Sequence, residues 1–146
     1  MRNVPTVYLA GAIEGRTHNE IFKWREYAKW YLQSAKIDVM FPPGLEWQGN
    51  EYVMSRKIVN TDLDSIDECQ ILLANFRHDI PMVGTSSEIF YCWENGYKAF
   101  VVIDPNFEKP SAWLIECSDI VFNSMDDALW YLTQVYGYEN EERNES

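Results

Sequence analysis

Residues 71–103 decide the fold class, and they read ILLANFRHDIPMVGTSSEIFYCWENGYKAFVVI. The apolar run Ile71–Phe76 predicts a buried strand, and the run Ala99–Ile103 predicts a second one. Between them, a polar loop leads to Gly84 and to a helix that we expect to end at Asn95-Gly96. Strands separated by a helix of this length form βαβ units, in which the strands run parallel. The stretch therefore predicts an α/β protein with a parallel sheet.

The remainder of the chain repeats this alternation of strand and helix. Strands are expected at residues 6–10, 37–41 and 120–122, and helices at 19–34 and 125–135. The pattern over 45–58 is ambiguous, whereas Thr61–Asp64 has the spacing of a capping box that opens a short helix. No repeat or linker divides the chain, so we expect one domain over residues 1–138 and an acidic tail over 139–146.

The charge of the chain is unevenly distributed. The sequence holds 12 Lys+Arg and 23 Asp+Glu, a formal charge of −11. Residues 1–60 carry eight basic and six acidic side chains (+2), and residues 61–146 carry four and seventeen (−13). Polymeric nucleic acid and anionic membranes require a cationic face, so we exclude both as partners. An anionic ligand must be held locally, by helix N-termini or by a few arginines.

Targeting segments and metal motifs are not evident in the sequence. The first apolar stretch is too short for a signal peptide, and no window approaches the roughly 18 apolar residues of a membrane span. Cys69, Cys92 and Cys117 lie far apart and form no CxxC, which favours buried thiols in a reducing, cytoplasmic setting. The two histidines form no zinc motif, and we expect neither a metal nor a cofactor.

Ligands of parallel sheets bind at the carboxyl ends of the strands, so the segments after the strands are expected to carry the chemistry. The first of these, Ala10–Gly15, is neither GxGxxG nor a P-loop. It is either a tight turn or, because Gly11 lacks a Cβ, a place where a flat or sugar-sized ligand lies against the backbone. In the helix that follows, Arg25 is one step off the apolar stripe and is free to reach a carboxylate, a ligand anion or solvent.

The segment Gly84-Thr-Ser-Ser-Glu88 allows two interpretations. In the first, Thr85 and Glu88 form a capping box and the glutamate only closes the helix start. In the second, Glu88 points into a cleft as a carboxylate nucleophile, and the hydroxyls of Ser86 and Ser87 join the helix amides in holding a phosphate.

A second carboxylate comes from the segment around Asp62. We expect Asp64 to cap the helix there, which leaves Asp62 free to face the cleft. Two carboxylates that reach one pocket from separate segments are the arrangement that cleaves glycosidic bonds, one at the anomeric carbon and one handling protons.

An ordered set of segments resembles the nucleoside 2-deoxyribosyltransferase family. These segments are Val7–Gly11, Trp24-Arg25, Asp62–Ile66 with Ile71–Ala74, Gly84–Gly96 and Val121–Leu132. The match extends over about residues 5–135, and its specificity comes from the order and spacing of the segments. The resemblance implies a flavodoxin-like, three-layer α/β fold with a five-stranded parallel sheet.

The resemblance also implies a cofactor-free transferase that acts on small nucleosides or nucleotides and free bases. Glu88 falls on the family's nucleophile, which attacks C1′ of a 2′-deoxynucleoside to give a deoxyribosyl ester. Asp62 falls on the aspartate that protonates the leaving base, and Gly11, next to Ala10, lines the base pocket. The family forms dimers or larger homo-oligomers in which a neighbouring chain closes the sugar site.

Three positions depart from the family pattern. Phe90 replaces a usual glycine, Gln70 a usual aspartate, and Met82 an aspartate that binds the sugar in some members; Asp79 is the candidate substitute. These departures leave two alternatives open. One is a hydrolase of deoxynucleoside 5′-monophosphates, whose phosphate the helix start at Gly84 holds, and the other is a nucleotide-binding module without turnover.

Overall fold

A five-stranded parallel sheet forms the middle layer of the computed structural model, which describes residues 4–104, 106 and 109–137. Its strands are β1 (Thr6–Gly11), β2 (Asp38–Met40), β3 (Ile71–Asn75), β4 (Lys98–Val102) and β5 (Ile120–Phe122). Their order in the sheet is β2-β1-β3-β4-β5, the order of the flavodoxin-like fold, as the sequence predicted. The order reverses between β1 and β3, so the carboxyl ends of these two strands flank the expected ligand crevice.

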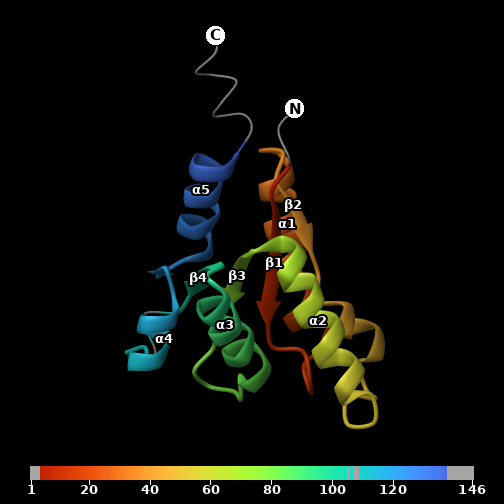
Figure 1. The fold of residues 1–146 in the computed structure, drawn as a ribbon. Helices are drawn as coiled ribbons and strands as arrows, with labels where there is room; N and C mark the ends of the chain where they lie inside the picture. Colours follow the sequence, from red (N-terminus) through yellow and green to blue (C-terminus); the bar gives the residue numbers. More distant parts are fainter. Residues whose placement is uncertain (1–3, 105, 107–108, 138–146) are drawn as a thin grey trace.

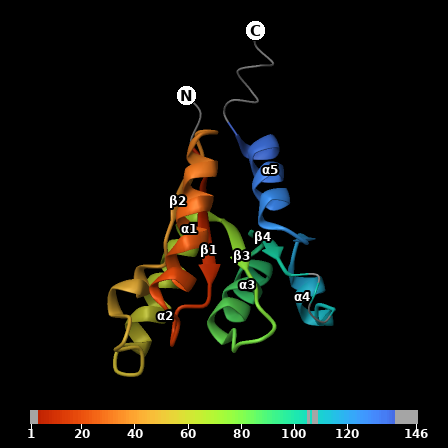
Figure 2. The same ribbon diagram turned by 180° about the vertical axis from the view of Figure 1, so that it is seen from behind.

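Helices cover both faces of the sheet and complete the three layers (Figure 1). The helices are α1 (His18–Gln33), α2 (Ser55–Cys69), α3 (Val83–Asn95), α4 (Ala112–Cys117) and α5 (Met125–Tyr136), with a 3-10 turn η1 (Pro43–Trp47). The helices α1 and α5 lie on one face, and α2, α3 and α4 lie on the other, as the view from behind also shows (Figure 2). No helix within the described ranges has the length and apolarity needed to cross a membrane.

The two faces of the sheet bury two separate cores. Along β1, Tyr8 and Ala10 enter the core beneath α2, α3 and α4, whereas Val7 and Leu9 enter the core beneath α1 and α5. All four side chains are fully buried. A parallel sheet covered on both faces requires such continuous apolar runs, which is why its strands were visible in the sequence.

The helix starts differ from the sequence expectation in one respect. Helix α2 begins at Ser55, so Thr61 lies in mid-helix and donates its hydroxyl to the carbonyl oxygens of Lys57 and Ile58. Asp64 is exposed within the same helix and caps nothing, so the predicted capping box was wrong. The sequence also did not predict α4, because six residues are too few to show a helical period. The expected tail at 139–146 lies outside the described residues.

Candidate active site

Glu88 faces the sheet from the second turn of α3. The hydroxyl of Tyr8, on β1, donates a 2.5 Å hydrogen bond to Glu88 Oε2. Helix α3 begins after Met82 without a side-chain cap, and Thr85 is buried within it. The capping interpretation of Thr85 and Glu88 was therefore wrong. The carboxylate is instead drawn inward because Glu88 borders the buried stripe of α3, which continues at Ile89.

The surroundings of Glu88 perturb its ionisation. Burial, and secondarily the charge of Asp62, raise the pKa of Glu88 to about 7, although the Tyr8 hydrogen bond and Arg25 act in the opposite direction. Burial and the neighbouring carboxylates raise the pKa of Tyr8 as well, so the phenol keeps its proton and remains a donor. A buried carboxyl group with a pKa near neutral is a candidate for chemistry.

Asp62 enters the site from α2. The backbone N–H of Gly44, in η1, donates a 2.7 Å hydrogen bond to Asp62 Oδ1. Burial raises the pKa of Asp62, while the Gly44 hydrogen bond and Arg25 lower it. Asp62 is close enough to Glu88 to raise the pKa of the glutamate. The structure thus brings together the two carboxylates that the sequence singled out.

Arg25 lies fully buried behind these carboxylates. Its guanidinium donates to the carbonyl oxygens of Leu9 (3.2 Å), Gly11 (3.2 Å) and Ile21 (2.8 Å). Two of these carbonyls are on β1, which the shorter β2 no longer accompanies. The backbone N–H of Asp38 donates to the Pro5 carbonyl (3.0 Å), and continuing this hydrogen-bond register puts Pro42, which has no N–H, opposite the Leu9 carbonyl.

Arg25 therefore replaces a missing strand, and it holds backbone instead of reaching solvent or a carboxylate directly. Burial lowers the pKa of Arg25 to about 10, and the negative charges of Glu88 and Asp62 oppose that shift. The guanidinium stays cationic at neutral pH, and its positive charge lowers the pKa of both Asp62 and Glu88.

Gly11 is required by packing at the end of β1. A Cβ at this position would lie 2.8 Å from Cζ2 of Trp24, so the indole fills the space beside the glycine. The Arg25 guanidinium in turn lies 4.7 Å from the centre of the Trp24 ring. Ala10, the other predicted base-pocket residue, is fully buried beneath α2 and α3.

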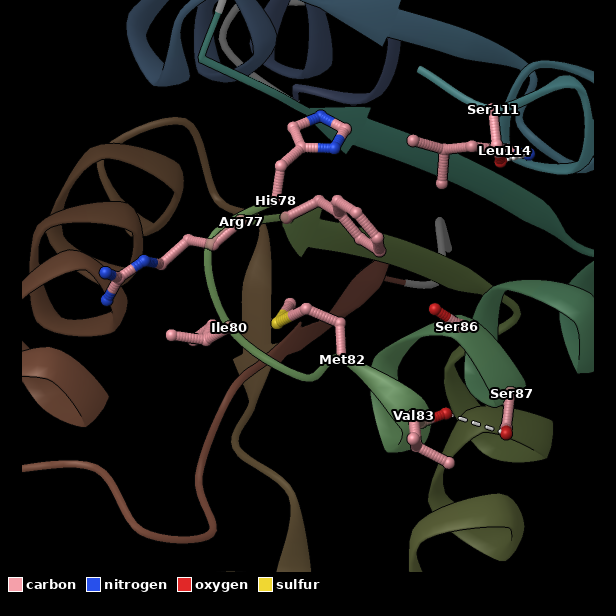
Figure 3. A pocket seen from close by; sticks show the side chains of 10 residues that line it. Arg77, His78, Ile80, Met82, Val83, Ser86, Ser87, Ser111 and Leu114 are labelled. Atoms are coloured by element: carbon pink, nitrogen blue, oxygen red, sulfur yellow. Dashed lines mark hydrogen bonds between the residues drawn. The ribbon is translucent and has the colours of Figure 1, made fainter. Parts of the chain in front are cut away.

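A hollow of about 520 Å³ opens on the α4 side of the α3 N-terminus (Figure 3). It is lined by Phe76, Arg77, His78, Ile80, Met82, Val83, Ser86, Ser87, Ser111 and Leu114. The Ser87 hydroxyl is engaged with the carbonyl oxygen of Val83 (2.8 Å), and the Ser86 side chain is exposed. His78 Nε2 is buried and has no hydrogen-bond partner within the described part of the chain. Glu88 does not line the hollow, so the carboxylates and the hollow are neighbouring but separate features.

Asp79 is committed to another side chain. Arg77 donates to both carboxylate oxygens of Asp79 (3.0 and 2.7 Å) and to Glu20 at the start of α1 (2.8 Å). Figure 3 shows the Arg77 side chain extending away from the hollow, so the pair fastens the loop after β3 to α1. Met82, at the start of α3, is buried and apolar.

Sequence reasoning missed Tyr8 and Gly44. The signal for Tyr8 was a phenol hydroxyl inside an otherwise aliphatic strand, since a buried tyrosine hydroxyl needs a partner. No comparable local signal marked Gly44. Among the described residues, no group of three or more His, Cys, Asp or Glu side chains is arranged to hold a metal ion.

Several solved structures are similar to this chain, among them the following three. The 2-deoxyribosyltransferase from Bacillus psychrosaccharolyticus matches with a TM-score of 0.68 at 16% identity, over 92% of this chain and 94% of that one. A conserved protein from Enterococcus faecalis V583 matches with a TM-score of 0.70 at 17% identity, over 90% and 99%. The chain shares their fold. The CMP N-glycosidase BcmB from Clostridium botulinum matches with a TM-score of 0.56 at 20% identity, over 87% and 97%.

No protein-family model and no curated protein sequence matches the chain. The structural neighbours nevertheless include a deoxyribosyltransferase, the kind of protein that the sequence segments resemble.

Proposed function

We propose that this protein cleaves the N-glycosidic bond of 2′-deoxynucleosides and transfers the deoxyribosyl group to another base. The observation that carries the proposal is the hydrogen bond from Tyr8, in β1, to Glu88, together with Asp62, whose charge raises the pKa of Glu88. The fold shared with a 2-deoxyribosyltransferase and a CMP N-glycosidase supports it.

In the proposed reaction, Glu88 forms the covalent intermediate. Tyr8 occupies Oε2, and Oε1 has no hydrogen-bond partner among the described residues, so Oε1 is the attacking atom. It bonds to C1′ as the C1′–N bond breaks, and Asp62 gives its proton to the leaving base nitrogen. The acceptor base then attacks C1′, releases the Glu88 carboxylate and returns a proton to Asp62.

The proximity of the carboxylates suits this division of labour. Two interacting acids share one proton over an interval of pH. The charge of Asp62 raises the pKa of Glu88, so the proton is more often on Glu88; the productive form is the other arrangement, with the proton on Asp62 and Glu88 ionised. Tyr8 and Arg25 both favour the ionised glutamate, since each lowers its pKa. Turnover is accordingly expected to fall on the acid side as Glu88 becomes protonated at about pH 7.

A second candidate is hydrolysis of deoxynucleoside 5′-monophosphates, which the hollow beside α3 favours. The first backbone hydrogen bond of α3 runs from the Ser86 N–H to the Met82 carbonyl, and no side chain caps the helix. The N–H groups of Val83, Gly84 and Thr85 are left to an anion, with the exposed Ser86 hydroxyl beside them. Water then replaces the acceptor base.

The other alternative, a binding module without turnover, was motivated by the bulk of Phe90 and by the missing loop aspartate, whose position Met82 occupies. Phe90 is 43% exposed and packs against Trp93 and Trp113, on the side of α3 away from the sheet. It does not crowd Glu88.

We propose that the exposed rings of Phe90, Trp93 and Trp113 contribute to the expected homo-oligomer, which analytical ultracentrifugation of a Trp113→Ser variant would test.

The experiment that tests the proposal follows base release and base exchange. The protein is incubated with deoxyinosine, with and without adenine, and with deoxynucleoside 5′-monophosphates. Dependence on adenine identifies a transferase, and release of base from the monophosphate alone identifies the hydrolase. Glu88→Ala is expected to lower turnover by at least about a thousandfold, because the covalent step is lost. Glu94→Ala, an exposed glutamate on the same helix, is the matched control.

If Glu88→Ala keeps wild-type turnover, the nucleophile assignment is wrong. If the wild-type protein binds nucleotide and releases no base over hours, the binding module replaces the enzyme as the function.

A further inference from the structure

We infer that Gly44 is a positioning residue: its backbone N–H and its missing side chain together hold Asp62 so that Oδ2 carries the proton delivered to the leaving base. The inference rests on the proposed function, because it assigns the proton of that reaction to one atom. It concerns Gly44, which lies in the segment after the second strand and was not among the candidate site residues.

The space around Gly44 admits no side chain. An added Cβ would lie 2.8 Å from Cγ2 of Ile58, 2.9 Å from Asp62 Oδ2 and 3.1 Å from Asp62 Oδ1. Cβ atoms in proteins essentially never lie within 3.0 Å of such atoms, so the first two contacts would force an atom to move. Gly44 does not have a positive φ, so the glycine is needed for space and not for backbone conformation. Any larger residue must therefore displace Asp62, Ile58 or the turn itself.

The turn that carries Gly44 is fastened from several directions. Within it, the Leu45 N–H donates to the Pro42 carbonyl (3.0 Å). Lys57 of α2 lies over the Trp47 ring, with its Nζ 5.8 Å from the ring centre. Beyond the turn, Gln48 Nε2 donates to the Arg16 carbonyl in the loop after β1 (3.4 Å). These contacts leave the turn little freedom to move away from a new side chain.

The hydrogen bond from Gly44 decides which oxygen of Asp62 bears the proton. Oδ1 accepts the 2.7 Å bond from the N–H, and an oxygen that accepts from a fixed donor does not itself carry a proton toward it. Oδ2 has no hydrogen-bond partner within the described ranges. The Oδ2 proton passes to the base nitrogen as the C1′–N bond breaks and Glu88 bonds to C1′. The base leaves neutral, and Asp62 is left as a carboxylate whose charge Gly44 helps to hold.

The test compares Gly44→Ala with a control in the same turn, Pro43→Ala, which loosens the backbone and adds no atom beside Asp62. Each is assayed on deoxyadenosine and on 7-methyl-2′-deoxyguanosine. The second base is already cationic and leaves without receiving a proton. For Gly44→Ala we expect kcat on deoxyadenosine to fall about a hundredfold with little change in KM, a size typical of lost general acid catalysis. On 7-methyl-2′-deoxyguanosine the loss is expected to stay below about threefold, and we expect the same of Asp62→Asn.

Three results would overturn the inference. Equal losses on both substrates would indicate general damage, a selective loss in Pro43→Ala would indicate that the turn and not Gly44 matters, and wild-type selectivity in Gly44→Ala would remove the role altogether. If Gly44→Ala does not fold, the double variant Gly44→Ala/Ile58→Ala relieves the contact with Ile58 and keeps the one with Asp62. An inactive Glu88→Ala beside a normal Gly44→Ala defeats only this inference. An active Glu88→Ala defeats the proposed function itself.

Discussion

The two faces of the sheet are built differently. On the face of α1 and α5, both helices begin on a hydroxyl cap: Thr17 accepts from the Glu20 N–H, and Ser124 accepts from the Asp127 N–H. On the other face, the short helix α4 is also capped, by Ser111, but α2 and α3 begin after Met54 and Met82 without a side-chain cap. Each missing cap forgoes about 1 kcal/mol of stability.

The buried chemistry follows the same division. The core beneath α1 and α5 consists of aliphatic and aromatic side chains, whereas the core beneath α2 and α3 includes the tyrosine that binds Glu88. The comparison teaches that one face supplies stability and the other gives up some stability for polar groups at the strand ends. Arg25 is the exception, because it is a charged residue of α1 that serves the opposite face.

The largest expected effect comes from removing that exception. Arg25→Met leaves the carbonyl oxygens of Leu9 and Gly11 without their Arg25 donor, so we expect a loss of about 3 kcal/mol in the free energy of unfolding, measured by urea titration. Lys23→Met, at an exposed position of the same helix, is the control and is expected to change it by less than about 0.5 kcal/mol. Similar values for the two variants would show that Arg25 is not a structural replacement for β2.

The second effect concerns the cost of the buried carboxylate. The pKa of Glu88 is about 7 in the folded protein against an ordinary 4.5, so the fold disfavours its ionised form. This cost is absent below about pH 4.5, grows as the pH rises, and is complete above about pH 7. We therefore expect Glu88→Gln to be more stable than wild type by on the order of 2 kcal/mol at about pH 8 and no more stable at about pH 4.

Chemical denaturation at the two pH values measures the difference, with Glu94→Gln as the exposed control on α3. A gain that is the same at both pH values would contradict the assignment of the pH dependence to Glu88.

A smaller effect is expected from the hydroxyl that holds the nucleophile. Tyr8→Phe removes a hydrogen bond that lowers the pKa of Glu88, so this pKa rises and the acid limb of the pH–rate profile moves to higher pH. We expect turnover near neutral pH to fall at least about tenfold. Tyr131→Phe, on the other face against Phe100 and Phe122, should leave the profile in place. An unshifted limb in Tyr8→Phe would separate the tyrosine from the ionisation of Glu88.

The smallest effect is expected from the cap of α1, on the face of α1 and α5. Thr17→Ala deletes the cap of α1 and is expected to cost about 1 kcal/mol of stability, with kcat/KM unchanged. Thermal unfolding and the base-release assay check the two halves of this statement. A fall in kcat/KM at unaltered stability would show that the capped face also takes part in the reaction.

The sequence revealed β1, β3 and β4 because each is a buried apolar run, and it revealed the end of α3 because Gly96 takes a left-handed conformation there. It did not reveal the start of α2, since residues 55–60 are mostly polar and show no apolar period. The spacing from Thr85 to Glu88 is the same for a cap and for a catalytic glutamate. Only the contact with Tyr8, 80 residues away in the chain, distinguishes them.

Pro42 affects the site by ending β2, although it has no part in the proposed reaction. Because proline has no N–H, β2 stops pairing with β1 at this point, and two other contacts form where a longer strand would have paired. The unpaired β1 carbonyl oxygens accept hydrogen bonds from Arg25, and the chain after Pro42 turns so that the Gly44 N–H donates to Asp62. A Pro42→Val variant would restore the missing donor and let the strand grow. Extension of a regular element would then compete with assembly of the site, so in this fold the end of a strand is itself a functional position.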